Sequence, residues 1–217
     1  TENTATSPTI NGGGAVCSGS TVNLSVSGSY TNYAWSGSGG TSASATYNNV
    51  TANTTYTVTV TGTGGCTATA TTNVTINPLP TPAITGSNAT CSGSNITLST
   101  STPYSTYIWS GGGGSSATAT YNNVTTNTTY TVTVTDGNGC QGTGTKSVTV
   151  NALPTIAIAT ACGGGLNTGS INTTAAAGAG GTLSYTINGT ADTDGDAANL
   201  ANGSYTVVVT EAPSGCS

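Results

Sequence analysis

A seven-residue pattern in which hydroxyl side chains alternate with tyrosine and valine occurs three times in this chain of 217 residues. The copies occupy residues 55–61, 129–135 and 204–210, with one extra valine in the third, and a cysteine follows each copy closely. A period of two places every second side chain on one face of an extended segment. Each copy therefore predicts a half-buried β-strand, and three copies predict three domains.

The first two domains are close duplicates, and the third is a more distant relative. A shift of 74 residues aligns the first two without a gap, pairing Cys17 with Cys91, Trp35 with Trp109, Tyr56 with Tyr130, and Cys66 with Cys140. The predicted boundaries are an N-terminal extension or donor strand at 1–8 and domains at 9–80, 81–154 and 155–217. Prolines make the linkers between domains short and stiff. The third domain lacks the last strand, which follows the cysteine in the other two.

The composition removes several classes of function. Only 3% of residues are charged, the sole basic side chain is Lys146, and there is no histidine. A nucleic-acid surface needs several cations to displace counterions from phosphates, so nucleic-acid binding is excluded. The usual catalytic bases and nucleophile partners are missing, so we predict that the chain is not an enzyme. No apolar run suggests a membrane span, and abundant threonine and valine favour an all-β fold.

Six cysteines fall two to a repeat. Pairing within repeats predicts one intradomain disulfide in each domain, namely Cys17–Cys66, Cys91–Cys140 and Cys162–Cys216. Small domains with few large apolar side chains need such a covalent constraint. Metal binding is the alternative, but the chain has neither a Cys-x-x-Cys pair nor a histidine. Disulfides of this kind imply an oxidising environment, so the predicted location is extracellular or at the cell surface.

The order of cysteine, tryptophan strand, tyrosine strand and cysteine is typical of immunoglobulin-like sandwiches. The predicted fold class is therefore all-β, with three tandem immunoglobulin-like β-sandwich domains. The cysteines lie outside their neighbouring strands, which differs from an antibody-type domain. The aromatic residues expected in the cores are Trp35, Tyr56, Trp109, Tyr130 and Tyr205.

Several finer motifs accompany this order, including Cys-Ser-Gly-Ser, Tyr-x-Trp-Ser-Gly, Gly-Cys and Asn-Pro-Leu-Pro. Together they resemble the immunoglobulin-like or PKD-like repeats of Bacteroidota cell-surface proteins. The third domain, with its Asn-Leu-Ala-Asn-Gly-Ser-Tyr-Thr-Val segment at 199–207, is similar to repeats of gliding-motility adhesins from the same group. The resemblance implies a large secreted or surface-attached protein that acts as a stalk, an adhesin or a filament.

One acidic turn is a candidate metal site. Asp192, Asp194 and Asp196 alternate within five residues, and such carboxylates can converge on a hard cation. The motif resembles calcium loops of surface proteins, although no bidentate glutamate follows at the expected distance. A solvated acidic turn is the alternative. Calcium is the only cofactor that the sequence suggests.

Two further features bear on glycans. Asn-x-Ser/Thr triplets are frequent, and Asn23, Asn53, Asn127 and Asn202 are candidate glycosylation sites. In a bacterium, we expect covalent sugars on the many hydroxyl side chains more than on asparagine. A second interpretation concerns the aromatic residues of each duplicate, which could form a sugar-binding platform: Tyr30, Tyr33 and Trp35, with Tyr104, Tyr107 and Trp109. Residues two apart share one face of a strand, so core packing is the ordinary explanation.

The missing strand of the third domain suggests how the chain assembles. A sandwich without its last strand exposes a sheet edge that invites strand addition. Residues 1–8 match the end of the strand at 67–76 and the linker after it, so they are a candidate donor strand. The sequence predicts a structural subunit of an extracellular bacterial filament or stalk, assembling head-to-tail as a homopolymer. The N-terminal segment of one copy would complete the third domain of its neighbour.

Three alternatives remain open at this stage. The same junction could be covalent, if the unit is part of one long polypeptide. The chain could instead be an adhesin or a carbohydrate-binding surface module, using its loop aromatics or the acidic turn. It could also be an accessory region of a secreted enzyme.

Overall fold

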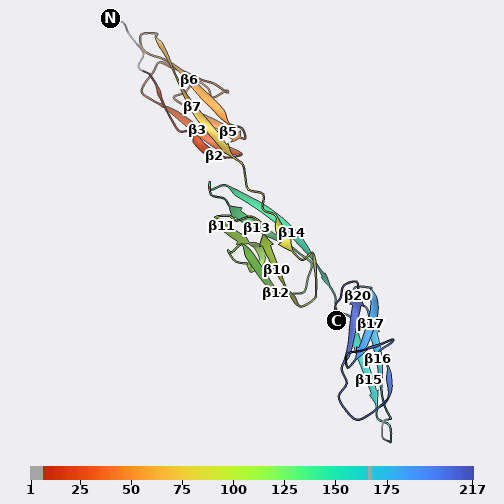
Figure 1. The fold of residues 1–217 in the computed structure, drawn as a ribbon. Coiled ribbons are helices and arrows are strands. Elements are labelled where there is room, and N and C mark those ends of the chain that lie inside the picture. Colours follow the sequence, from red (N-terminus) through yellow and green to blue (C-terminus); the bar gives the residue numbers. More distant parts are fainter. Residues whose placement is uncertain (1–6, 166–167) are drawn as a thin grey trace. The chain divides into compact units, whose positions relative to one another are not determined.

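The computed structural model describes residues 7–165 and 168–217 of the chain. Those residues form strands β1 to β20 and one short 3₁₀ turn at Ser110–Gly112, so the all-β prediction is confirmed. The strands fall into three consecutive groups, and each group contributes two sheets (Figure 1). β2 and β9 are short strands that the sequence did not predict.

The first group is an immunoglobulin-like sandwich. One sheet has the order β1-β3-β5, with β1 at Thr9–Asn11, β3 at Ser20–Ser27 and β5 at Ser44–Val50. The other has the order β2-β7-β6-β4, with β2 at Gly14–Cys17, β7 at Thr67–Asn77, β6 at Thr54–Thr61 and β4 at Asn32–Trp35. All pairs are antiparallel except β2 with β7. The first strand segment thus pairs with one sheet as β1 and with the other as β2.

Alternation places the core between these two sheets. Val58 and Val60 of β6 are completely buried, and Tyr56 is 5% exposed. The indole Nε1 of Trp35 donates a hydrogen bond to the Ser42 carbonyl oxygen at 2.9 Å, so the one polar atom of this buried ring has a partner. The remaining core residues are Val22, Leu24, Val26, Ala45, Tyr47, Val50 and Val74.

The second group repeats the first. One sheet has the order β12-β10-β8, with β12 at Thr118–Val124, β10 at Ser94–Thr100 and β8 at Ile84–Gly86. The other has the order β11-β13-β14-β9, with β11 at Thr106–Trp109, β13 at Thr128–Thr135, β14 at Gln141–Asn151 and β9 at Ala89–Cys91. Its buried residues include Leu98, Tyr107, Trp109, Tyr130, Val132 and Val134.

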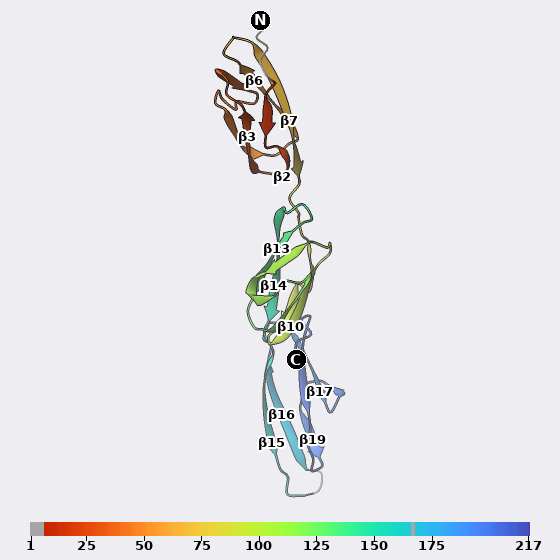
Figure 2. The same cartoon turned by 90° about the vertical axis from the view of Figure 1, so that its left-hand side faces the viewer.

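The third group has fewer strands. β15 (Thr155–Ala161), β16 (Gly169–Ala176) and β19 (Ala197–Leu200) form one sheet, and they lie side by side in Figure 2. β18 (Thr190–Asp192), β17 (Thr182–Ile187) and β20 (Val207–Ala212) form the other. Among its described apolar side chains apart from cysteine, only Ile171 and Val209 are buried. Tyr205, expected in the core, is half-buried and precedes β20, the last strand of its sheet among the described residues.

The disulfide pattern differs from the prediction. The bonded pairs are Cys17–Cys140 and Cys91–Cys216, each with a Cα–Cα distance of 5.5 Å, whereas Cys66 and Cys162 are free and exposed. The predicted pairings within domains, Cys17–Cys66, Cys91–Cys140 and Cys162–Cys216, are therefore wrong.

The strand register explains the error. Cys17 ends β2 opposite Asn77, the last residue of β7, whereas Cys66 immediately precedes the first residue of β7. Eleven residues of extended strand separate the two positions by about 35 Å. A disulfide requires Cα atoms within about 7 Å, so the two cysteines of one sandwich cannot meet.

The chain divides into two compact units, and each unit contains one of the disulfides. One compact unit contains the residues up to Thr81 together with Val134–Gly142, and the other contains Pro82–Thr133 together with Thr143–Ser217. The turn between β13 and β14 thus packs with the first sandwich, and it carries Cys140, the partner of Cys17. Each disulfide lies inside one compact unit and joins cysteines from successive repeats.

Candidate assembly site

The outer edge of β20 is the most unusual feature of the third sandwich. The equivalent strands β6 and β13 lie inside four-stranded sheets, between β4 and β7 and between β11 and β14. Among the described residues, β20 pairs only with β17 in its sheet. In the first two sandwiches β7 lies beside β6 and β14 lies beside β13, but no described strand lies in the corresponding position beside β20. An open strand edge of this kind can pair with another strand.

A groove of about 290 Å³ lies at the end of the third sandwich where β20 begins. It runs between the two sheets of the third sandwich, with β15, β16 and β19 on one side and the start of β20 on the other. Its lining is mainly apolar side chains and glycine backbone. The residues that contribute to it include Ile158, Ala161, Cys162, Ile171, Leu200, Tyr205 and Val207.

Apolar side chains around the groove are incompletely covered. Ile156 is 43% exposed and Ile158 is 48% exposed, although both belong to a strand of the sandwich. Ile10, on the corresponding strand β1 of the first sandwich, is half-buried. Among the described residues, no strand beyond β20 covers this side of the gap between the sheets. Exposed apolar surface of this kind marks an interaction site.

The third sandwich also has no counterpart of β2 among the described residues. In the first sandwich the chain leaves β3 after Asn11 and continues as β2, parallel to β7, up to Cys17. In the third sandwich β15 stays paired with β16 from Thr155 through Ala161. Cys162 follows directly and is exposed. The first cysteine of this repeat thus lacks the parallel strand against which Cys17 and Cys91 are placed.

The second cysteine of every repeat ends a turn that is closed by two backbone hydrogen bonds, and the turn at Cys216 is one residue longer than the other two. In the first repeat the Gly62 N–H donates to the Cys66 carbonyl oxygen at 2.9 Å, and the Gly65 N–H donates back to the Gly62 carbonyl oxygen at 2.9 Å. Two corresponding bonds join Asp136 with Cys140 and Gly139, and two join Glu211 with Cys216 and Gly215. The turn around free Cys66 therefore has the backbone arrangement of the turn at Cys140, whose thiol is bonded.

Glu211 holds together part of the third sandwich, a role that was not predicted from the sequence. Its side chain is completely buried, and its carboxylate accepts hydrogen bonds from the N–H groups of Gly178, Ala179 and Gly181 at 2.6 to 3.1 Å. These N–H bonds, chiefly those of Gly181 and Ala179, lower the pKa of Glu211, while burial opposes the effect. The ionised carboxylate thus holds the loop between β16 and β17.

The low pKa of Glu211 predicts an acid-sensitive third sandwich. The folded-state pKa lies below the unfolded value of about 4.3, so the stabilisation is fully present above that pH and is lost as the pH falls through the folded-state pKa. Thermal unfolding between pH 7 and pH 2 measures this. Glu211→Gln should be less stable than the parent protein at pH 7, and the difference should shrink at low pH. Equal pH profiles for the two proteins would contradict the assignment.

The acidic turn at Asp192–Asp196 uses its carboxylates to stabilise its own backbone. Asp192 Oδ1 accepts the N–H groups of Asp194 and Gly195 at 3.1 and 2.7 Å, and these bonds lower the pKa of Asp192. Asp196 Oδ1 accepts the Thr173 N–H at 2.6 Å. Among the described residues, no three Asp, Glu, His or Cys side chains group closely enough to hold a metal ion. Calcium binding stays a prediction from the sequence.

The candidate glycosylation sites are all exposed. Two of them also support their sandwiches: Asn53 Oδ1 accepts the Ile76 N–H at 2.7 Å, and Asn127 Oδ1 accepts the Val150 N–H at 2.6 Å. Asn23 Oδ1 accepts the Thr46 hydroxyl, and Asn202 lines the groove of the third sandwich. Glycosylation at these positions stays a prediction.

The predicted aromatic platforms are largely part of the cores. Tyr107 and Trp109 are 9% and 4% exposed, and Trp35 is 7% exposed, so these rings offer little surface for a sugar to stack on. Tyr33 is half-buried and packs against the core of the first sandwich. The side chains of these strands therefore fill the interior of their domains.

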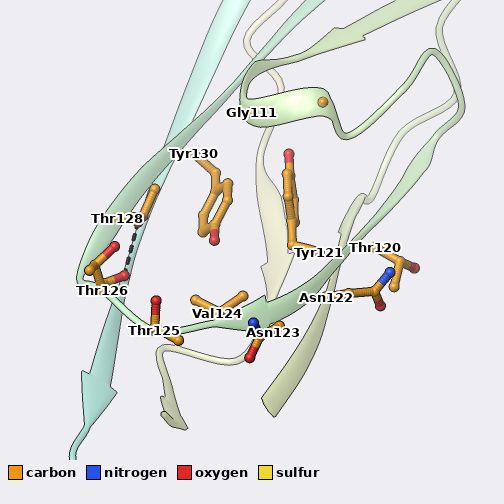
Figure 3. A pocket seen from close by; sticks show the side chains of 11 residues that line it. Gly111, Thr120, Tyr121, Asn122, Asn123, Val124, Thr125, Thr126, Thr128 and Tyr130 are labelled. Atoms are coloured by element: carbon orange, nitrogen blue, oxygen red, sulfur yellow. Dashed lines mark hydrogen bonds between the residues drawn. The ribbon is translucent and has the colours of Figure 1, made fainter. Parts of the chain in front are cut away.

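An open hollow of about 470 Å³ occurs in the second sandwich, next to the turn after β12 (Figure 3). At its base Tyr121 and Tyr130 face each other with ring centroids 4.1 Å apart, and the Tyr121 hydroxyl donates to the Ser110 carbonyl oxygen at 2.9 Å. Burial, and to a lesser degree Tyr130, raises the pKa of Tyr121. Both rings are buried, so asparagine and threonine side chains form most of the accessible wall. A matching hollow occurs around Tyr47 and Tyr56.

Comparison with known proteins gives structural likenesses only. No protein-family model matches the sequence, and no curated protein matches it significantly. Similar solved structures include a marsupial T cell receptor, with 14% identity over 93% of this chain and 91% of that one and a TM-score of 0.36. Murine CEACAM1b shows 12% identity over 65% of this chain and all of that one, with a TM-score of 0.31. Dpr2 Ig1-Ig2 in complex with DIP-Theta Ig1-Ig3 also appears, at 14% identity, 88% and 83% coverage and a TM-score of 0.29.

The strand order within each group, rather than these likenesses, defines the class of protein. The chain is a region of tandem immunoglobulin-like β-sandwiches whose successive repeats are joined by disulfides. Within the part of the chain that the structure describes, no helix is long and apolar enough to cross a membrane.

Proposed function

We propose that the chain is a structural subunit of an extracellular bacterial filament or stalk, and that its third sandwich accepts a β-strand from a second copy. The observation that carries the proposal is the groove where β20 begins, next to an unpaired sheet edge and lined by Ile158, which is 48% exposed. A strand placed there would hydrogen-bond to the β20 backbone and cover the apolar side chains.

The N-terminal segment at 1–8 is the donor in this proposal. By the shift that aligns the first two repeats, Asn3 corresponds to Asn77 at the end of β7, and Pro8 corresponds to Pro82 in the following linker. Residues 1–6 lie outside the described residues. The segment thus matches the end of the strand type that the third sandwich lacks.

Such a contact is head-to-tail, because the donor precedes the first sandwich and the acceptor is the third. A heterologous contact of this kind does not close into a dimer, and its repetition generates a filament. The two disulfides support an oxidising location outside the cytoplasm. The near absence of charge leaves little electrostatic repulsion between copies.

Deletion of residues 1–8 tests the proposal. The truncated protein should remain monomeric at concentrations where the full chain forms filaments, because the groove then has no donor. Negative-stain microscopy and analytical sedimentation measure the outcome. Leu79→Ala is a suitable control, since this side chain lies in a linker between sandwiches and is 47% exposed. Filaments of normal length from the truncated protein would show that strand donation is wrong.

A further inference from the structure

The two disulfides of the chain follow one rule. Cys17, the first cysteine of its repeat, bonds to Cys140, the second cysteine of the next repeat. Cys91 and Cys216 are related in the same way. Two cysteines remain free. Cys162 is the first cysteine of the third repeat, and its partner by this rule would lie in a following repeat. Cys66 is the second cysteine of the first repeat, and its partner would lie in a preceding one.

We infer that Cys162 of one copy and Cys66 of the next copy form a disulfide, so that the filament is covalently linked along its length. The inference rests on the proposed function, in which the first sandwich of one copy follows the third sandwich of another. The joint between copies would then repeat the joints within a copy, with the same cysteine positions in the same order.

Cys66 already has the local backbone structure of a bonded cysteine. Its turn shares the backbone hydrogen bonds of the turn at Cys140, and in all three turns the first residue donates to the cysteine carbonyl oxygen. The Cys66 side chain is exposed, whereas Cys140 and Cys216 are covered at 0% and 1% exposure. The turns also differ in their side chains, since Asp136 Oδ1 accepts the Cys140 N–H at 2.9 Å and glycine occupies the matching position 62.

Strand donation would complete the surroundings of Cys162. Cys17 and Cys91 lie opposite Asn77 and Asn151, and the residue after each cysteine donates its N–H to that asparagine's carbonyl oxygen at 2.9 and 2.8 Å. Asn3 of the donor is the aligned residue. Cys162 lines the groove that the donor would enter. The same event therefore fills the groove and brings the first sandwich of the donor copy, with its Cys66, next to Cys162.

A covalent link also answers a weakness of the strand contact. The donor has Thr1 and Glu2 where the first sandwich has Thr75 and Ile76, so it brings fewer apolar side chains than β7 does. Strand addition alone would rest largely on backbone hydrogen bonds, each of which contributes only about 1 kcal/mol net. A disulfide makes the joint independent of this modest stability.

The chemistry is a two-electron oxidation. The two cysteine thiols lose two protons and two electrons as the Sγ–Sγ bond forms. A disulfide-carrying oxidant of the exported compartment accepts them by thiol–disulfide exchange and leaves as a dithiol.

Serine variants test the inference. Assembled protein is alkylated, denatured without reductant and separated by size. The parent protein should give a ladder of multiples of 20.8 kDa that collapses to 20.8 kDa on reduction. Cys66→Ser alone and Cys162→Ser alone should each give monomers. An equal mixture of the two variants should give covalent dimers and nothing larger, because each copy then keeps one thiol of the joint.

Several outcomes would overturn the disulfide. These are alkylation of both thiols in the assembled parent protein, unreduced monomers without free thiols, or disulfide dimers formed by either variant alone. Peptide mass spectrometry provides a direct readout, using a protease that does not depend on the single lysine. Microscopy separates the two proposals. Filaments without a ladder contradict the disulfide and leave strand donation intact, whereas a ladder that persists after deletion of residues 1–8 contradicts strand donation alone.

Discussion

Cys140→Ser is expected to lower the free energy of unfolding of the monomer by up to about 5 kcal/mol. The Cys17–Cys140 bond spans a sequence separation of 123 residues, and the chain-entropy model gives about that value for closing a loop of this length. The estimate is an upper value, because residues 82–133 inside the loop belong to the other compact unit and restrict the open chain by their own folding. Urea unfolding without reductant measures the change.

The matched control is Cys66→Ser, which changes the equivalent residue of the first repeat. Cys66 is free and exposed in the single chain, so its replacement should change the stability of the monomer by no more than about 0.5 kcal/mol. Adding a reductant should destabilise the parent protein more than Cys140→Ser does, because it also breaks the Cys91–Cys216 bond. If the two serine variants were equally stable, the assignment of the bond to Cys140 would be wrong.

The sandwich cores were largely predictable from the sequence. Alternation in the segment at 55–61 identified β6 to within one residue, and the aligned tryptophans and tyrosines proved to be buried. The signal is strong because a half-buried strand has a period of two and the duplicated repeat presents it twice. The short strands β2 and β9 gave no such signal. Gly14–Cys17 has no alternation, and its position depends on a parallel pairing with a strand about 60 residues away in sequence.

That missed pairing also caused the error in the disulfides. Spacing alone cannot determine connectivity, since six cysteines allow fifteen arrangements. Once Cys17 is placed opposite Asn77, at the far end of β7 from Cys66, pairing within a repeat becomes impossible. Glu211 was missed for a different reason. Its partners are backbone N–H groups of a loop 30 to 33 residues away in sequence. Almost every residue type has such a group, so the loop sequence does not indicate the contact.

A variant of the chain whose third sandwich carries its own last strand should be monomeric. The variant appends residues 142–151 of β14 directly after Ser217, which takes the position that Gln141 has after Cys140. In the first two sandwiches the last strand follows the second cysteine directly and pairs antiparallel to its neighbour. The appended strand can do the same with β20. Because it is tethered, its effective concentration at the groove is in the millimolar range, and it should exclude a donor from another copy.

Two measurements follow from this variant. Ile158 and Val207 would become covered, which should raise the free energy of unfolding of the third sandwich by about 2 kcal/mol, given that both are already partly buried. Filament formation should be abolished at the same time. The control carries the same appended segment with prolines at two positions that pair with β20, because proline has no N–H to donate and cannot occupy an inner strand. This control should assemble like the parent protein. Normal filaments from the variant with the intact strand would mean that the groove where β20 begins is not where copies join.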